Sequence, residues 1–207
     1  GARASRPRVA RTCPRNVVPR VFRGRSALMN LSDTLVQPKC IPDGSKIWWD
    51  VRPHHLYPTI EFRLCDVCTR VDEASCLSAI FQASLATLWK LRRDNITVRV
   101  YNSELIEENK WLAVRWGLDG RLFDLGREEE YPARELVREL IAWFIDDVLD
   151  ELGSRKEVEY AFRILDEGTS ADRQLAVFSK TGDLKAVVDS LIAETAEGVG
   201  LDSPALF

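Results

Sequence analysis

Polar and hydrophobic residues alternate along residues 58–67, whose sequence is PTIEFRLCDV. A period of two is typical of a β-strand, in which successive side chains point to opposite faces. Ile60 and Phe62 therefore share one face, which we expect helices to cover. Glu61 and Arg63 share the other face, and we expect them to point toward an open cleft. Two charges in an otherwise apolar run require either water or a chemical role.

The same patterns predict the other elements of the chain. A short strand is predicted over 46–52, where aromatic and β-branched residues gather, and a second strand over about 59–66. Beyond residue 68 the hydrophobic period becomes that of amphipathic helices. The predicted helices cover residues 70–93, 104–116, 133–152, 155–167, 170–180 and 183–196. In the first of them, the apolar stripe consists of Leu77, Ile80, Phe81, Leu85 and Leu88.

Short polar motifs predict where helices and turns begin. Thr69 with Asp72, and Ser154 with Glu157, have the three-residue spacing of a capping box. The pair Asp119-Gly120 is a hairpin signal. A turn and a short strand are therefore predicted at this point, between two of the helices.

Helices that stack on a few short strands indicate an α+β fold with a small antiparallel sheet. Pro132 suits the first turn of a helix, and Gly117 and Gly153 are expected to end helices. The chain has 207 residues, 45% of them hydrophobic, which is enough for one domain with a core. No apolar run approaches the roughly 18 residues of a membrane span, so no membrane partner is expected.

Charge is distributed unevenly along the chain. The net charge is −3, but residues 1–30 hold eight arginines and no acidic residue, which leaves −11 on the other 177 residues. The acidic body argues against a specific nucleic-acid partner. The Arg-rich start is either a basic arm for polyanions or targeting, or an unstructured or mistranslated segment. We expect a disordered tail over 1–40, a folded domain over 41–198 and a second tail over 199–207.

The five cysteines are an odd number and no signal peptide is recognised, so reduced thiols and a cytoplasmic location are expected. Cys65-x-x-Cys68 matches half of a zinc ribbon, but a second pair at ligand spacing is absent. We therefore expect free thiols. His54 and His55 are adjacent, so their side chains diverge, and we expect a hydrogen-bonding loop there rather than a metal site.

Glu61 and Arg63 are candidates for phosphate chemistry. Residues two apart on a strand are about 6.6 Å apart, which is too far for a tight salt bridge fixed by the backbone but suits two groups that face one phosphate. A carboxylate binds Mg²⁺, and an arginine fork pairs with phosphate oxygens. The alternative is a structural ion pair beneath helices. The polar residues Asp50, Arg52 and His54 lie close by in sequence, and we expect Arg52 or His54 in the same cleft.

Several blocks of the sequence resemble a known family. These blocks are KIWWDVRPHHLYPTIEFRLCDVCTRVDEA, IEENKWLAVRWGLDG, PARELVRELI and SADRQLAVFSKTGDLKAVVD. They are similar to the C-terminal half of the type 2 carboxylate–amine ligases related to glutamate–cysteine ligase, over about residues 41–198. The resemblance implies a remnant of a glutamine-synthetase-like fold, in which a small antiparallel sheet packs against several helices. It also implies that an amine and a carboxylate are joined into a γ-glutamyl-type amide through an acyl phosphate, with ATP and Mg²⁺.

The resemblance assigns roles to individual residues. In the segment IEFR, Glu61 matches the magnesium-binding carboxylate, and Arg63 matches the catalytic arginine that steadies the transferring phosphate. Arg52 and His54 belong to the block DVRPH, which is expected to line the same site and bind the nucleotide. A small amino acid or amine is the expected partner, and the resemblance allows a homodimer.

Other matches are expected to be structural. Asn109, Lys110 and Arg115 match a later block, and we expect them to serve helix packing rather than substrate binding. The family's glutamate-rich first strands have no counterpart before residue 46, so we expect an incomplete chain with little turnover of its own. The alternative function is a noncatalytic helical interaction module or an inactive fragment of the family.

Overall fold

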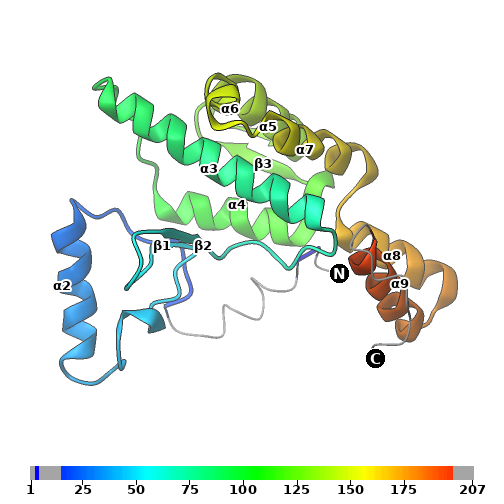
Figure 1. The fold of residues 1–207 in the computed structure, drawn as a ribbon, viewed down its shortest axis with the longest axis horizontal. Helices are drawn as coiled ribbons and strands as arrows, with labels where there is room; N and C mark the ends of the chain where they lie inside the picture. The colour runs from blue at the N-terminus through cyan, green and yellow to red at the C-terminus, as the bar shows by residue number, and fades with distance from the viewer. Residues whose placement is uncertain (1–2, 5–14, 198–207) are drawn as a thin grey trace.

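The structure, a computed structural model, describes residues 3–4 and 15–197 (Figure 1). It is α+β, as predicted, with helices and two separate antiparallel sheets of two strands each. The glutamine-synthetase-like arrangement stays a prediction. Among the described residues, no helix is both long and apolar enough to cross a membrane. The elements are α2 (Arg25–Val36), η1 (Gly44–Lys46), β1 (Val51–Pro53), β2 (Ile60–Phe62), α3 (Val71–Arg93), α4 (Ser103–Trp116), η2 (Gly117–Asp119), β3 (Arg121–Asp124), β4 (Glu129–Pro132), α5 (Ala133–Glu139), η3 (Leu140–Ile145), α6 (Asp146–Leu152), α7 (Arg155–Glu167), α8 (Ser170–Thr181) and α9 (Leu184–Ala196).

The main core forms where α3 packs against α7 and against the long helical stretch of η3 and α6 (Figure 1). Helix α3 contributes the small buried residues Cys76, Ala79 and Ala83. Small side chains allow the helix backbones to approach closely, and the larger Ile145 and Val158 fill the space opposite them. Of the expected α3 stripe of larger residues, Ile80 packs against the border of this core, and none is among its buried residues.

Helix α3 also begins differently from the prediction. Its N-cap residue is Arg70, whose side chain makes no capping hydrogen bond. The hydroxyl of Thr69 instead contacts the hydroxyl of Ser170 and a carboxylate oxygen of Glu194, each at 3.1 Å. The capping box predicted at Thr69 was wrong, because this residue joins the start of α3 to α8 and α9. At the other end of α3, Leu88 is exposed.

A second, smaller core lies beside α2. Ile41, Ile47 and Trp49 are buried, and Leu28 of α2 is among the apolar residues packed against them. Helix α2 lies within the stretch 1–40 for which we expected a disordered tail, and its Leu28 contacts this core. The boundaries proposed for the folded domain stay a prediction, and the expected tail over 199–207 lies outside the described residues.

The helix predicted over 133–152 extends through α5, η3 and α6. Pro132 precedes its first turn, and Gly153 ends it with a left-handed φ of 64°. Segment η3 in the middle is π-helical, which the sequence pattern did not indicate. Ile141 and Ile145 of η3 are buried, so this segment turns apolar side chains toward α3.

The strands and turns are shorter than predicted or lie elsewhere. The strand predicted over 46–52 is reduced to β1, which η1 precedes, and the strand predicted over 59–66 is reduced to β2. The turn and the short strand predicted around Asp119-Gly120 are present as η2 and β3, but this pair is not the turn of the β3–β4 hairpin. Asp119 ends η2, and the turn that connects β3 to β4 covers residues 125–128.

Capping also departs from the prediction at α7, and α8 has a capping box that was not predicted. The Ser154 hydroxyl is buried without a hydrogen-bond partner among the described residues, so the capping box expected there does not form. A capping box does form at Thr169 and Asp172, at the start of α8. Spacing alone does not distinguish these two motifs.

Candidate functional site

The charged face of β2 is built around one carboxylate. Strands β1 and β2 pair antiparallel, and their register places Arg52 opposite Glu61. Arg52 donates to one oxygen of Glu61, with both Nε and Nη2 at 2.8 Å from Oε2. Arg63 donates to the other oxygen, with Nη1 at 2.6 Å from Oε1. The expectation that Glu61 and Arg63 lie too far apart for a salt bridge was wrong, because their long side chains span the distance between the backbone positions.

Arg52 has no free hydrogen-bonding nitrogen. Besides its two bonds to Glu61, its Nη1 donates to the carbonyl oxygens of Ser45 at 2.8 Å and Ile47 at 2.5 Å. The side chain is 9% exposed. These contacts connect η1 to the sheet and hold Glu61 in place. They involve no nucleotide, and the expected role of Arg52 in nucleotide binding stays a prediction.

Arg63 differs from Arg52 in having unused donor capacity. Its backbone N–H donates to the carbonyl of Asp50, which fixes the residue beside β1. Its Nε is buried without a hydrogen-bond partner among the described residues, and its side chain is 25% exposed. A guanidinium with an unpaired N–H group can donate a hydrogen bond to an additional partner, such as an anionic oxygen.

The two arginines keep Glu61 ionised. Partial burial acts to raise the pKa of Glu61, but the hydrogen bonds from Arg63 and Arg52, supported by their positive charges, outweigh it and lower the pKa. Glu61 is therefore a carboxylate acceptor at neutral pH, and the cluster of Arg52, Glu61 and Arg63 carries a net positive charge.

The loop after β1 forms the hydrogen-bonding arrangement that we expected. The Nδ1 atom of His54 accepts from the backbone N–H groups of Leu56 at 3.2 Å and Tyr57 at 3.1 Å. The ring of His54 also contacts the rings of His55 and Tyr57, with centroids 4.8 and 4.9 Å apart, so the expected divergence of the two histidine side chains was wrong. The proton of neutral His54 therefore lies on Nε2.

A cavity of about 390 Å³ lies between this loop, η1 and α2. It is lined by Arg52 and His54, but Glu61 and Arg63 are not among its lining residues. This cavity is therefore not the cleft that we expected to hold Glu61 and Arg63 together with Arg52 or His54. The apolar face of β2 is only partly covered as well, because Phe62 stacks on Phe81 of α3 while Ile60 is 45% exposed.

These residues do not by themselves fit a magnesium ion. Mg²⁺ requires about six oxygen ligands, whereas Glu61 is a single carboxylate whose two oxygens are each held by an arginine. In the part of the chain that the structure describes, no group of three or more His, Cys, Asp or Glu side chains is placed to hold a metal. The predicted role of Glu61 as a metal ligand is not supported by its present contacts.

Residues of the later block have structural contacts, as expected. The side-chain amide of Asn109 donates to the carbonyl of Phe123 and accepts from its N–H, both at 2.7 Å, so it pairs with the backbone of β3 as another strand would. Lys110 Nζ lies 2.6 Å from Asp50 Oδ2, and both side chains are largely buried. The guanidinium of Arg115 lies over the ring of Trp116. Asp50 thereby connects α4 to the segment before β1.

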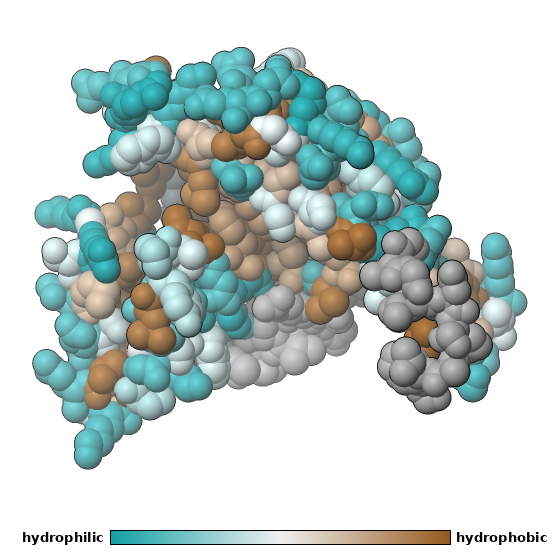
Figure 2. Space-filling model, in the orientation of Figure 1, coloured by the Kyte–Doolittle hydropathy of each residue, from teal (hydrophilic) through white to brown (hydrophobic). Residues whose placement is uncertain are grey.

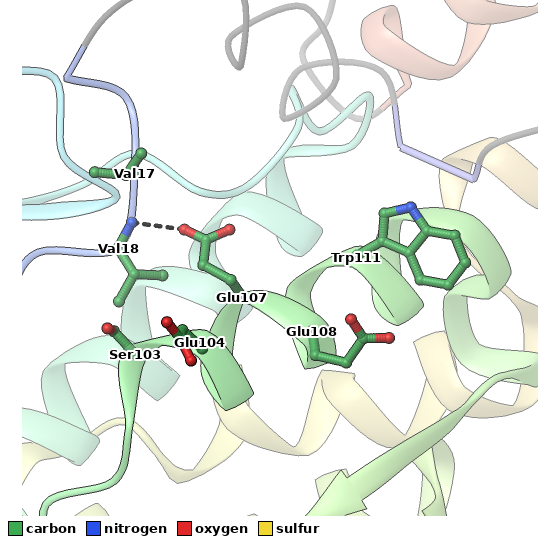
Figure 3. Close-up of a pocket in the computed structure, with 7 residues that line it drawn as sticks. All are labelled: Val17, Val18, Ser103, Glu104, Glu107, Glu108 and Trp111. Atoms are coloured by element: carbon green, nitrogen blue, oxygen red, sulfur yellow. Dashed lines mark hydrogen bonds between the residues drawn. The ribbon is translucent and has the colours of Figure 1, made fainter.

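An acidic cavity of about 710 Å³ lies at the start of α4, apart from the β1–β2 cluster (Figure 3). Glu104, Glu107 and Glu108 line it together with Trp111, and Glu107 accepts from the backbone N–H of Val18 at 2.9 Å. The i, i+3, i+4 spacing of these three carboxylates was the available sequence signal for this cavity.

A buried polar network was also missed. Arg173 of α8 donates through Nη2 to Glu73 at 2.6 Å and to Thr69 at 3.2 Å, and through Nε to Glu194 at 3.1 Å. Glu73 is 5% exposed, so its charge requires this arginine. The network attaches α8 and α9 to the start of α3, on the far side of the fold from β1 and β2 (Figure 1).

The fold and the cluster thus define an α+β protein whose small sheet carries an arginine-held carboxylate. The family model described as glutamate-cysteine ligase family 2 (GCS2) matches residues 3–190. The chain belongs to this family. The start that we expected for the match, near Ile41, was wrong, because the family pattern extends through the Arg-rich segment.

Curated relatives give the same result. The chain is 50% identical over 199 residues to a protein of Chloroflexus aggregans, which covers 96% of this chain and 51% of the relative. It is 53% identical over 186 residues to a protein of Roseiflexus sp. strain RS-1, covering 90% of this chain and 49% of the relative. Both are named "Putative glutamate--cysteine ligase 2". The chain spans about half the length of the curated relatives it matches.

Proposed function

We propose that this chain carries the phosphate-binding arginine of an ATP-dependent carboxylate–amine ligase of the glutamate–cysteine ligase type. The substrates are ATP, a glutamate-type carboxylate and a small amine or amino acid such as cysteine. The product is a γ-glutamyl-type amide. Family membership supports the reaction class, and the contacts of Arg63 support its place in the reaction.

The observation that carries the proposal is the different hydrogen bonding of the two arginines around Glu61. Arg52 uses all of its nitrogens on protein acceptors, whereas Arg63 keeps a buried Nε without a partner among the described residues. The Arg63 side chain is also 25% exposed, against 9% for Arg52, so it is the guanidinium that an anionic oxygen can reach. Arg63 is therefore the group that gains from a phosphate, and Arg52 is a positioning residue.

In the proposed reaction, an oxygen of the substrate carboxylate attacks the γ-phosphorus of ATP. The bond from that phosphorus to the β–γ bridging oxygen breaks, and ADP leaves. The amine nitrogen then attacks the acyl carbon of the acyl phosphate, inorganic phosphate leaves, and the nitrogen loses a proton. Arg63 donates to the oxygens of the transferring phosphoryl group, where negative charge is concentrated. Glu61 holds the guanidinium of Arg63 in one orientation through the 2.6 Å hydrogen bond.

Magnesium, which normally accompanies ATP, has no step in this scheme. Glu61 would supply only one carboxylate, and the further oxygen ligands would have to come from outside the described residues. The contribution of this chain is thus limited to binding and orienting the phosphoryl group.

The proposal is tested by ADP release that depends on both the amine and the carboxylate. We would assay this chain with ATP, Mg²⁺, glutamate and cysteine, alone and mixed with the part of the Chloroflexus aggregans relative that it does not match. We expect turnover in the mixture and little in the chain alone. Arg63→Lys should slow it at least tenfold, because an ammonium lacks the planar fork. The control Arg163→Lys changes an exposed arginine that pairs with Glu167 on the same helix, and should leave the rate unchanged. Absence of turnover in the mixture, or equal rates for wild type and Arg63→Lys, would refute the proposal.

A further inference from the structure

The segment that connects α3 to α4 has the composition of a β-strand. Residues 96–101 read ITVRVY, with β-branched or aromatic residues at all positions but one. Ile96, Val98 and Val100 alternate with Thr97 and Arg99. This pattern is the same period of two that marks β2, yet the structure assigns no strand to residues 96–101.

The backbone of residues 97–101 has no hydrogen-bond partner among the described residues. The N–H of Ile96 donates to the carbonyl of Leu91, which ends α3. From Thr97 to Tyr101, no backbone N–H or carbonyl group forms a hydrogen bond with another described residue. A segment of strand-like composition whose backbone groups are unpaired is a template for a further strand.

One face of the segment is apolar and exposed. Ile96 is 54%, Val98 43% and Val100 66% exposed. The opposite face is occupied within the segment itself, because the Arg99 guanidinium lies over the ring of Tyr101 at 5.1 Å.

Apolar surface continues into the start of α4, where Leu105 and Ile106 are 41% and 37% exposed. Figure 2 shows apolar surface around a hollow between the helical body and the part of the chain that contains α2. Exposed apolar residues gathered along one stretch of chain are typical of a surface that another polypeptide covers.

We propose that residues 96–101 form an edge strand, and that its occupant is a β-strand from the part of the family protein that this chain does not span. The chain matches its relatives along almost all of its own length but along only about half of theirs. The two described sheets have two strands each, and a two-stranded sheet is marginally stable by itself. Main-chain pairing along 96–101 would supply affinity, and Val98 and Val100 would pack against apolar side chains of the partner.

This inference goes beyond the proposed function and does not depend on it. It rests on family length, exposed apolar residues and unpaired backbone groups, none of which involve Arg63 or Glu61. A failed assay for ADP release would therefore leave it unaffected.

The test combines hydrogen exchange with binding. The probe is a polypeptide consisting of the part of the Chloroflexus aggregans relative that this chain does not match. We expect the amides of residues 97–101 to exchange rapidly in this chain alone and at least tenfold more slowly in the complex. The double substitution Val98→Lys/Val100→Lys should weaken the complex at least tenfold. The matched control Val188→Lys/Ile192→Lys places two lysines on exposed apolar positions of α9 and should bind as wild type does.

Three results would overturn the proposal. They are the absence of a complex, a complex in which residues 97–101 still exchange rapidly, and equal binding by Val98→Lys/Val100→Lys. Protection that appears in this chain alone as its concentration rises would assign the segment to a second copy, and would also overturn the occupant chosen here.

Discussion

Substitution of Glu61 by glutamine perturbs the centre of the β1–β2 cluster without changing its shape. Glutamine keeps one carbonyl oxygen but replaces the other oxygen with an NH₂ group. One of the two arginines then faces a donor instead of an acceptor. The substitution also removes the negative charge that Arg52 and Arg63 share.

The expected cost follows from the contacts. Glu61 accepts at 2.8 Å from Nε and from Nη2 of Arg52, and at 2.6 Å from Arg63. Hydrogen bonds to charged groups contribute about 1.5–3 kcal/mol each, but partly exposed pairs contribute less because water screens them. The Glu61 side chain is 32% exposed, whereas that of Arg52 is 9% exposed. We therefore expect Glu61→Gln to lower the free energy of unfolding by about 2–3 kcal/mol, near the value of one such bond.

Urea unfolding measures this change. With a slope of about 2 kcal/mol per molar urea, the midpoint should fall by about 1 M. The control Glu130→Gln removes a carboxylate that is 72% exposed, 3.6 Å from Arg121, and should change the midpoint by less than about 0.3 M because surface ion pairs contribute little. A midpoint for Glu61→Gln within that same margin would show that the cluster does not hold β1 and β2 together.

The lowered pKa of Glu61 adds a pH dependence. A carboxyl group whose pKa is lower in the folded state stabilises the protein above its unfolded-state pKa, which is about 4.5. This contribution is lost as the pH falls through the folded-state pKa. The difference in unfolding free energy between wild type and Glu61→Gln should therefore be constant above pH 5 and should shrink below pH 4. A difference that does not change with acid would contradict the assigned ionisation.

Three further predictions concern other parts of the fold. Asn109→Ala leaves two backbone groups of β3 unpaired and should lower the free energy of unfolding in urea by about 2–4 kcal/mol. A loss below about 1 kcal/mol would refute a stabilising role for the pairing of Asn109 with Phe123. Arg173→Gln leaves Glu73 buried without its cation and should cost about 3 kcal/mol or more, and adding Glu73→Gln should recover part of that loss. Burial raises the pKa of Cys76 to about 11, so at pH 8 iodoacetamide should modify the exposed Cys40 first. Equal rates for the two thiols would contradict the packing of α3.

Local signals in the sequence located most helices. Gly117 and Gly153 both adopt left-handed φ values, of 61° and 64°, at the ends of helices, as their missing side chain allows. The alternation indicated the strand that contains Glu61, and Arg63, just beyond β2, contacts its carboxylate. These features depend on residues a few positions apart, which is why the sequence alone indicates them.

Packing between distant segments could not be predicted in the same way. Hydrophobicity favoured Leu88 as a core residue of α3, whereas close approach of α7 selected Ala83 and Cys76. The pairing of Asn109 with Phe123, and that of Arg173 with Glu73, depend on how elements come together, and no local spacing indicates them. Likewise, Asp119-Gly120 has the composition of a hairpin turn, but η2 extends directly from α4 at this point.

The central claim is that Arg63 binds phosphate while Arg52 only positions Glu61. The most direct measurement is the equilibrium binding of ATP, followed by titration calorimetry, to wild type and Arg63→Ala in the presence of the unmatched part of the Chloroflexus aggregans relative. The control Arg163→Ala removes a guanidinium of the same size from the surface of α7. We expect Arg63→Ala to weaken ATP binding at least tenfold and Arg163→Ala to leave it unchanged. Equal ATP affinities for wild type and Arg63→Ala, or no ATP binding by wild type, would contradict the account.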